Sequence, residues 1–386
     1  MPKSTFKRIL VDSKSNARGS FVINPNGYAA APSEMCQRLI LQFTLTCEDS
    51  GEAPTALNFE TFAQNVIITS RYRDGSPFIE AVNASLLDFR AAAFRSADTR
   101  AGGDFAVPGS CTQSGGVITL NLPIEFTDPR RRVPGDVSVP LAEIGQFNIQ
   151  ANLTQGVTNG AITGAVCTLY AHCSDEAEPV LGQRIVYSLQ NLQGQSTTFD
   201  NGNRILRSID AYQTAAGSTL YTDIQSGFQL FLDGELAVDG STIGNLEAFN
   251  AQFAEPFYKP FYTILSTYAT FANASPLTFG AGYYSELGAP CRHAKVYDFG
   301  EGTSATDLQA VSKVRFQASN PGSGINGVQL LISAYEPQTA ESLQRRKMSL
   351  GLGLATVEPN VSDTQAATSL SPTAKASLPA VIATRG

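Results

Sequence analysis

A sequence pattern that occurs twice constrains the fold of this chain more than any other feature. Ile149–Asn152 (IQAN) precedes a polar loop and the apolar segment Ile162–Ala171; Phe316–Ser319 (FQAS) precedes a shorter loop and the segment Ile325–Ala334. The matched segments lie 167 positions apart before the loop and 163 after it, so one loop-length change explains the difference. Repeats at a fixed spacing indicate duplicated structural units.

Two further matches extend the repeat towards the N-terminus. Asp74–Gly75 corresponds to Asp233–Gly234, and Ala81–Ser85 (AVNAS) corresponds to Ala237–Ser241 (AVDGS). Asp-Gly favours a tight hairpin turn, because glycine adopts positive φ without steric cost. Four matches in the same order therefore predict two similar β units, joined by the acidic segment Ser174–Pro179.

Most of the chain has strand patterning. Apolar residues alternate with more polar ones in two clear series, Leu39, Leu41, Phe43 and Leu45, and Ile118, Leu120, Leu122, Ile124 and Phe126. Such alternation predicts half-buried strands. Within the two units, short helices are expected in Asn83–Arg95 and Ile243–Phe253. The predicted fold class is all-β, with two tandem eight-stranded jelly rolls, short helices in loops and flexible terminal arms.

Four regions follow from these patterns. We expect a basic N-terminal arm over residues 1–19, a first jelly roll over 20–175, a second over 176–336 and a C-terminal tail over 337–386. The tail is rich in Ala, Ser, Thr and Pro, and it contains one helical candidate, Ala340–Leu354, which Gly351 and Gly353 weaken.

A G-x-G-x-x-G match at Gly322–Gly327 raises the alternative of a dinucleotide site. That site requires a helix directly after the glycines. Here Val328–Tyr335 follows, and its β-branched and aromatic residues predict a strand. The glycines are therefore interpreted as a turn into the last strand of the second unit.

Charge and cysteine content restrict the partners and the cellular location. The net charge of −7 gives no general attraction for nucleic acid or an anionic membrane. The six cysteines form no metal-binding spacing; buried reduced thiols are the first interpretation, and disulfides are the alternative in an oxidising environment. No signal peptide or spanning segment is recognised, so a protein made and retained in the cytoplasm is expected.

The chain resembles the double jelly-roll major capsid proteins of tailless icosahedral, membrane-containing viruses, the tectivirus and adenovirus lineage. The resemblance covers about residues 15 to 337 and is carried mainly by RGSFVINPNG, RLILQFTLT and FAQNVIITSRYRDGSPFIEAVNAS in the first unit. It implies a bacteriophage coat protein whose homotrimers, with two rolls per chain, form pseudo-hexagonal capsomers that tile an icosahedral shell. The implied location is the virion capsid.

The resemblance also implies partners and surface features. Expected partners are neighbouring capsomers, penton or vertex proteins, minor capsid proteins and an internal viral membrane, without sequence-specific nucleic acid. Residues 95–114 and 254–292 are candidates for outer tower loops. Within the second, the aromatic cluster Phe257–Tyr262 fits either a subunit interface or a core strand.

Two basic clusters are candidate contact sites. The N-terminal cluster, for which membrane head groups or a neighbouring subunit are the expected partners, consists of Lys3, Lys7, Arg8, Lys14 and Arg18. The second cluster is Arg130, Arg131 and Arg132, which we interpret as an inter-subunit loop in preference to a nucleic-acid site.

Catalytic features are weak. The two histidines, His172 and His293, lie near Cys173 and Cys291, but neither half contains a recognisable triad or metal-ligand motif. The prediction is a structural protein rather than an enzyme, with no cofactor. The alternatives are a β-sandwich carbohydrate-binding or receptor-attachment protein and a β-sandwich glycoside hydrolase; the absence of tryptophan disfavours both sugar-related functions.

Overall fold

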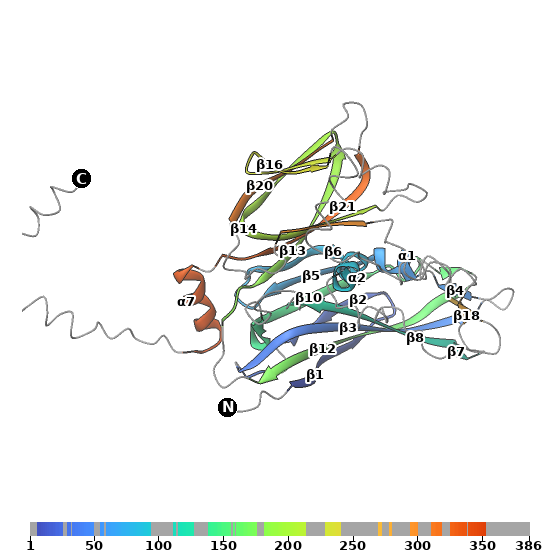
Figure 1. Cartoon of the computed structure of the whole chain (residues 1–386). Coiled ribbons are helices and arrows are strands. Elements are labelled where there is room, and N and C mark those ends of the chain that lie inside the picture. The colour runs from blue at the N-terminus through green and yellow to red at the C-terminus, as the bar shows by residue number, and fades with distance from the viewer. Residues whose placement is uncertain are drawn as a thin grey trace, which may run out of the picture. The chain divides into compact units, whose positions relative to one another are not determined.

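The computed structural model describes residues 6–25, 29–31, 33–49, 55–57, 59–93, 111–112, 115–126, 138–155, 157–158, 160–175, 181–213, 228–240, 269–271, 278–279, 294–299, 310–318, 325–337 and 339–352. The chain divides into two compact units, Met1–Gln338 and Thr339–Gly386, which are described separately. Strands dominate the first unit, as Figure 1 shows.

The first half of the larger unit is an eight-stranded jelly roll. Its strands in chain order are β1 (Phe6–Ser15), β2 (Ser20–Ile23), β3 (Glu34–Asp49), β5 (Val66–Tyr72), β6 (Pro77–Asn83), β8 (Gly115–Glu125), β10 (Ile144–Ala151) and β12 (Gly160–Asp175). One sheet has the order β1-β12-β3-β8 and the other the order β2-β10-β5-β6. Numbered from one to eight along the chain, these orders are 1-8-3-6 and 2-7-4-5, the jelly-roll arrangement of two facing four-stranded sheets.

Shorter elements are attached to this roll. Helices α1 (Phe59–Gln64) and α2 (Ala84–Ala93) lie before β5 and after β6, and a 3-10 helix spans Leu141–Glu143. The additional short strands are β4 (Thr55–Leu57), β7 (Cys111–Thr112), β9 (Val139–Pro140), β11 (Val157–Thr158), β17 (Ala269–Phe271) and β18 (Thr278–Phe279). The helix expected within Asn83–Arg95 is thus confirmed as α2; that expected within Ile243–Phe253 lies outside the described residues.

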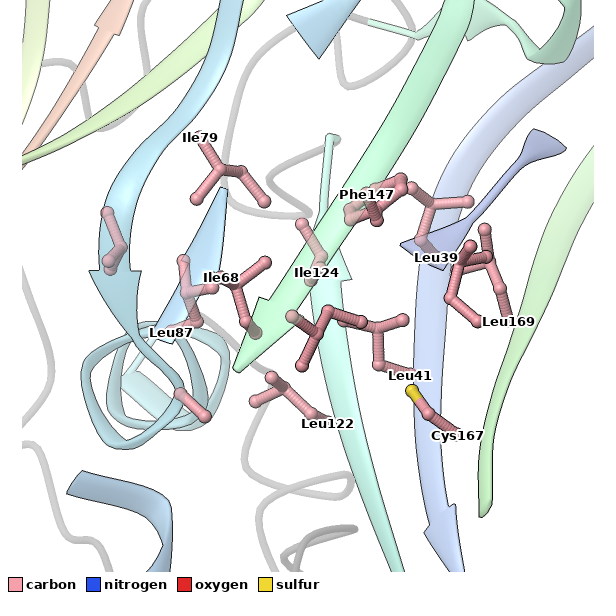
Figure 2. Packing of buried hydrophobic residues seen from close by; sticks show 14 of the residues in the cluster. Leu39, Leu41, Ile68, Ile79, Leu87, Leu122, Ile124, Phe147, Cys167 and Leu169 are labelled. Atoms are coloured by element: carbon pink, nitrogen blue, oxygen red, sulfur yellow. The ribbon is translucent and has the colours of Figure 1, made fainter. Parts of the chain in front are cut away.

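Apolar residues of the two predicted alternating series lie in the core of the first roll. Leu39, Leu41 and Phe43 on β3 are fully buried, and Leu122 and Ile124 on β8 are at most 1% exposed. Figure 2 shows side chains from both sheets meeting in one cluster, among them those from β3, β5 and β10. A large apolar side chain buried in this way stabilises the fold by roughly 1.5–3 kcal/mol before entropic losses.

The second half has the same strand order. Its strands are β13 (Ile185–Gly194), β14 (Ser196–Gln213), β15 (Phe228–Leu232), β16 (Glu235–Gly240), β19 (Ala294–Asp298), β20 (Ala310–Ala318) and β21 (Ile325–Tyr335). The long strand β14 occupies two positions: residues 196–205 pair with β20, and residues 205–213 pair with β21. The two sequences of neighbours are therefore β13-β21-β14-β19 and β14-β20-β15-β16.

Counted with both parts of β14, the second half again follows 1-8-3-6 and 2-7-4-5. It has a separate apolar core that includes Ile209, Val314, Phe316 and Leu330. The prediction of two tandem jelly rolls is therefore confirmed by the strand order itself.

The sequence repeat coincides with equivalent structural positions. Ile149 lies on β10 and Phe316 on β20, each the seventh strand of its roll, whereas the longer matched segments form the eighth strands, β12 and β21. Gly75 and Gly234 both occupy the turn between the fourth and fifth strands, with φ of 88° and 92°. The predicted last strand is confirmed as β21, but it begins at Ile325 and therefore includes Gly327, which the sequence analysis interpreted as part of the turn.

The N-terminus differs from the expected arm. Phe6–Ser15 forms β1, the first strand of the first roll, and pairs antiparallel with β12. Ile9 and Val11 are both 8% exposed and belong to the core of the first roll. The basic residues around them interrupt the apolar alternation, so the sequence analysis did not recognise this strand. The roll begins at β1 and not at residue 20.

In the smaller unit, α7 (Ala340–Ser349) confirms the helix expected within Ala340–Leu354. Thr339 and Ser342 form a reciprocal capping box at its N-terminus, and Gly351 has a φ of 66° just after its end. Glycine accommodates this left-handed conformation and thereby ends the helix.

Candidate functional site: the junction between the two jelly rolls

The junction between the rolls begins with a parallel strand pair. Tyr187 and Ser188 on β13 pair with Ile79 and Glu80 on β6. This pairing connects the edge of one sheet of the first roll to the edge of one sheet of the second, and an 11-stranded sheet results. Figure 1 shows β6 and β13 side by side at this position.

Strand β21 contributes side chains to the cores of both rolls. Leu330 and Ile332 belong to the second core, whereas Leu331 and Tyr335 belong to the first. All four are at most 1% exposed. A strand buried on both faces has a continuous apolar run instead of alternation, which accounts for the sequence VQLLISAY. The two rolls therefore share a hydrophobic layer at the junction and are not connected by a linker alone.

A buried ionic cluster lies where the chain enters β13. The Nε of Arg184 donates a hydrogen bond to Glu143 Oε2 at 3.1 Å, and its Nη1 donates to Asp74 Oδ2 at 2.7 Å and to Ser76 Oγ at 2.9 Å. Glu336 Oε2 lies 3.7 Å from the same Nη1. Arg184 is 2% exposed and Glu143 is completely buried, so water screens their attraction little.

Tyr72 on β5 reinforces the cluster. Its ring centroid lies 4.5 Å from the guanidinium carbon of Arg184, and its hydroxyl donates a 2.7 Å hydrogen bond to the carbonyl of Ile185. The backbone N–H of Glu336 in turn donates to the carbonyl of Arg184 at 2.8 Å. Arg184 is thus bound to the first roll by its side chain and to the end of β21 by its backbone.

The charges of this cluster support one another. Burial lowers the pKa of Arg184, but the Glu143 carboxylate and the hydrogen bond to Asp74 outweigh burial, and its pKa is raised. Burial raises the pKa of Asp74, but hydrogen bonds from Ser76 and Arg184 outweigh it, and the pKa of Asp74 is lowered. Both groups therefore remain charged near neutral pH.

A second ion pair connects α2 of the first roll to β14 of the second. The Nη1 of Arg90 lies 3.3 Å from both carboxylate oxygens of Asp210 and donates a hydrogen bond to the Ser208 hydroxyl. Ser208 and Asp210 are completely buried. Burial raises the pKa of Asp210, although the charge and hydrogen bond of Arg90 act in the opposite direction.

A third ion pair is more exposed. Arg204 Nη1 lies 3.3 Å from Glu80 Oε2, with side chains 22% and 44% exposed. Exposed pairs of this kind contribute roughly 0–1 kcal/mol, so we assign little of the junction's stability to it.

Sequence analysis missed the residues of the junction. Asp74 was recognised only as a turn residue, and Arg184, Glu143, Arg90 and Asp210 were not singled out. One signal was present: Asp210 is a charged residue within an apolar strand pattern, ILRSIDAY, where a buried partner is expected. The identity of that partner depends on contacts between distant parts of the chain.

The structure places only part of the predicted N-terminal basic cluster. Lys7, Arg8 and Lys14 belong to β1; the Lys14 side chain is 50% exposed and lies 3.2 Å from Asp12. Arg18 is exposed in the turn after β1. Lys3 and the second cluster, Arg130, Arg131 and Arg132, lie outside the described residues, as do residues 254–268 with the aromatic cluster.

The weak catalytic candidate is not supported by the strand geometry. His172 and Cys173 are consecutive residues of β12, so their side chains point to opposite faces of the sheet. His293 and Cys291 lie outside the described residues. Within the described part of the chain, no group of three or more His, Cys, Asp or Glu side chains could hold a metal ion.

The fold and the junction together define a tandem jelly-roll protein. No protein-family model and no curated protein matches the sequence. Solved structures similar to the chain include the major capsid protein P2 of bacteriophage PM2, at 8% identity, a TM-score of 0.47 and coverage of 87% of this chain and 99% of that one. The Sulfolobus turreted icosahedral virus structure has 13% identity, a TM-score of 0.43 and coverage of 90% and 97%.

The mavirus major capsid protein is also similar, at 10% identity, a TM-score of 0.36 and coverage of 86% of this chain and 87% of that one. With TM-scores below 0.5, these likenesses do not establish a shared fold by themselves. The jelly-roll assignment rests on the strand order of this chain.

Within the described residues, none of the helices has the length and apolar character needed to span a membrane.

Proposed function

We propose that this chain is the major capsid protein of an icosahedral virus and that it assembles as homotrimers. The observation that supports this proposal is the repetition of one strand order, 1-8-3-6 and 2-7-4-5, in both halves of the larger unit. Three chains with two equivalent rolls present six similar modules around a threefold axis. Such an object has a nearly hexagonal outline and can tile a flat facet.

The junction supports this proposal by making the two rolls one rigid module. A tile keeps its outline only if its rolls cannot rotate against each other. The shared layer at β21 and the buried cluster around Arg184 oppose that rotation. A binding protein with two independently acting modules has no need for a buried ionic cluster between them.

The finer partners are part of the same proposal. We infer contacts with neighbouring capsomers, with penton or vertex proteins and minor capsid proteins, and with an internal viral membrane, and we infer a location in the virion capsid after synthesis in the host cytoplasm. Catalysis is not part of the proposed function. The basic clusters at Lys3–Arg18 and Arg130–Arg132 remain the proposed contact sites for membrane or neighbouring subunits.

Light scattering after size-exclusion chromatography tests the assembly. The expected mass is three times the 41.0 kDa of one chain, and negative-stain images should show particles with a hexagonal outline. A stable monomer at micromolar concentration, without hexagonal particles, would contradict the proposal. A lower-order assembly such as a dimer would also contradict it, because twofold symmetry does not generate six modules.

The membrane contact needs a test that leaves β1 intact. Deleting residues 1–18 would remove the first strand of the roll, so we instead propose the triple substitution Lys3→Gln, Lys14→Gln and Arg18→Gln. Co-sedimentation with vesicles containing phosphatidylserine should decrease at least several-fold in the variant, since each basic side chain near an anionic surface contributes about 1 kcal/mol. Equal sedimentation of both proteins would exclude this cluster from membrane binding.

A further inference from the structure

Two buried cysteines of the first roll face each other across neighbouring strands. Cys36 on β3 and Cys173 on β12 are directly paired in the antiparallel ladder. Both are completely buried, and both belong to the first apolar core. Directly paired residues of an antiparallel sheet point to the same face, so the two thiols share one side of the sheet.

A bulge in β3 produces this pairing. Arg38 is paired with His172 and Cys36 with Cys173, so Gln37 is left without a counterpart in β12. A regular ladder would place Gln37 opposite Cys173 and turn Cys36 to the outer face. Bulges re-aim side chains in this way. The local irregularity of β3 is therefore what brings the two sulfur atoms to the same side.

The backbone geometry suits a covalent bond. Directly opposed residues of an antiparallel pair have Cα atoms about 4.5–5.5 Å apart. This range lies within the roughly 4.4–6.8 Å that disulfides require. We propose that Cys36 and Cys173 form a cross-strand disulfide when the folding chain meets a small-molecule disulfide such as oxidised glutathione. The proposal does not depend on the capsid function.

The exchange is balanced without any further reactant. The thiolate of one cysteine attacks a sulfur of the oxidant, forms a mixed disulfide and releases one small thiolate. The second cysteine, as its thiolate, then attacks the protein-bound sulfur of the mixed disulfide and releases the second small thiolate. The two protons of the protein thiols are transferred to the two released thiolates, so the protein loses two electrons and the oxidant gains two.

Burial determines when the reaction occurs. Both cysteines are completely buried in the core. On the side of β3 away from β12, Cys36 is also paired with Val139 of β9. Exchange therefore takes place while β3 and β12 are still closing during folding or during local opening. In the structure described here, both side chains are thiols.

Cys167 provides a matched control on the same strand. It is also a completely buried thiol in the first core, but Phe43 is the residue opposite it on β3. Burial, together with the charge of Asp12, raises the pKa of its thiol. Cys167 therefore has no thiol opposite it on β3.

The test is refolding of the full chain in a glutathione buffer, followed by alkylation and peptide mass spectrometry. The expected product is a Cys36–Cys173 linked peptide that disappears after reduction. Because the bond closes a loop on the order of 140 residues, the oxidised protein should also melt about 5–10 °C higher than the reduced one. Full alkylation of both cysteines, when the oxidised protein is unfolded in denaturant without a reductant, would overturn the proposal.

Variants keep the test independent of folding defects. Cys36→Ala and Cys173→Ala should each lose the linked peptide and the difference in melting temperature between oxidised and reduced protein. Cys167→Ala should keep both. A linked peptide that persists in Cys36→Ala, or a difference in melting temperature that depends on Cys167, would contradict the assigned pair. If a single variant does not fold, the linkage in the wild type and in Cys167→Ala still decides the question.

Discussion

The two jelly rolls have the same strand order but differ in how the chain passes from one sheet to the other. In the first roll, the second and third strands are the separate elements β2 and β3. In the second roll, the continuous strand β14 serves both positions, and its ladder with β20 is irregular between Asp200 and Arg204. The duplicated order thus persists although the local connection has changed.

The equivalent turns of the two rolls show a second difference. Asp74 and Asp233 precede glycines with nearly the same φ, yet their carboxylates have different partners. Asp74 accepts a hydrogen bond from Arg184 at the junction, whereas Asp233 accepts from the backbone N–H groups of Ser312 and Lys313 within its own roll. The shared Asp-Gly motif therefore determines the backbone conformation of the turn, but it does not determine which groups the aspartate carboxylate contacts.

The largest expected effect comes from the junction. Arg184→Met removes the cation beside the completely buried Glu143, and we expect the free energy of unfolding to fall by about 3–5 kcal/mol. Urea denaturation monitored by circular dichroism measures this loss. The matched control is Arg204→Met at the exposed pair with Glu80, which should cost less than about 1 kcal/mol. Equal losses in both variants would show that burial does not set the strength of the junction.

Two glycines with positive φ, Gly19 in the first roll and Gly202 in the second, should lose different amounts of stability when they are replaced by alanine. Gly19, in the turn between β1 and β2, has a φ of 75°, and an added Cβ would lie 2.1 Å from the Ala151 carbonyl oxygen. Gly19→Ala should therefore cost about 1–2 kcal/mol for the backbone conformation and about 1–3 kcal/mol for the clash. Gly202 in β14 has a φ of 64° with no atom within 4 Å of the added Cβ, so Gly202→Ala should show only the first loss.

Urea denaturation of both glycine variants measures this difference. If Gly202→Ala were as destabilising as Gly19→Ala, the close approach to Ala151 would not be the cause of the loss at residue 19.

The smallest expected effect is a pH dependence that distinguishes the two equivalent aspartates. The pKa of Asp74 is lowered in the folded state, so its contribution to stability is present above its ordinary value of 3.8 and disappears as the pH falls through the lowered value. Asp74→Asn should therefore flatten the loss of stability that the wild type shows as the pH falls below 3.8. Asp233→Asn serves as the control, because the Asp233 carboxylate accepts hydrogen bonds from backbone N–H groups. Parallel pH profiles for wild type and Asp74→Asn would contradict this assignment.

The repeat made the jelly-roll pair predictable because duplicated strands carry the same local patterns. Asp74–Gly75 and Asp233–Gly234 marked equivalent turns, and the alternation at Leu39 to Leu45 marked the inner face of β3. Such features depend on residues within a few positions of one another, and they can be recognised before any long-range contact is known.

The N-terminal strand and the junction could not be predicted in this way. In β1, the short apolar series Ile9 and Val11 is surrounded by charged residues, and only its pairing with β12 makes it a strand. Arg184 contacts Asp74 and Glu143, residues far away in the sequence, so no local pattern identifies them as partners.

The amino-acid pattern alone thus specified that the chain consists mostly of strands, where the Asp-Gly turns lie and that the unit is duplicated, because periodicity and turn chemistry are local properties. Tertiary structure decided which buried charges pair, which thiols face each other and how β21 is shared between two cores. Those outcomes depend on burial and on distances between segments that meet only after the chain has folded.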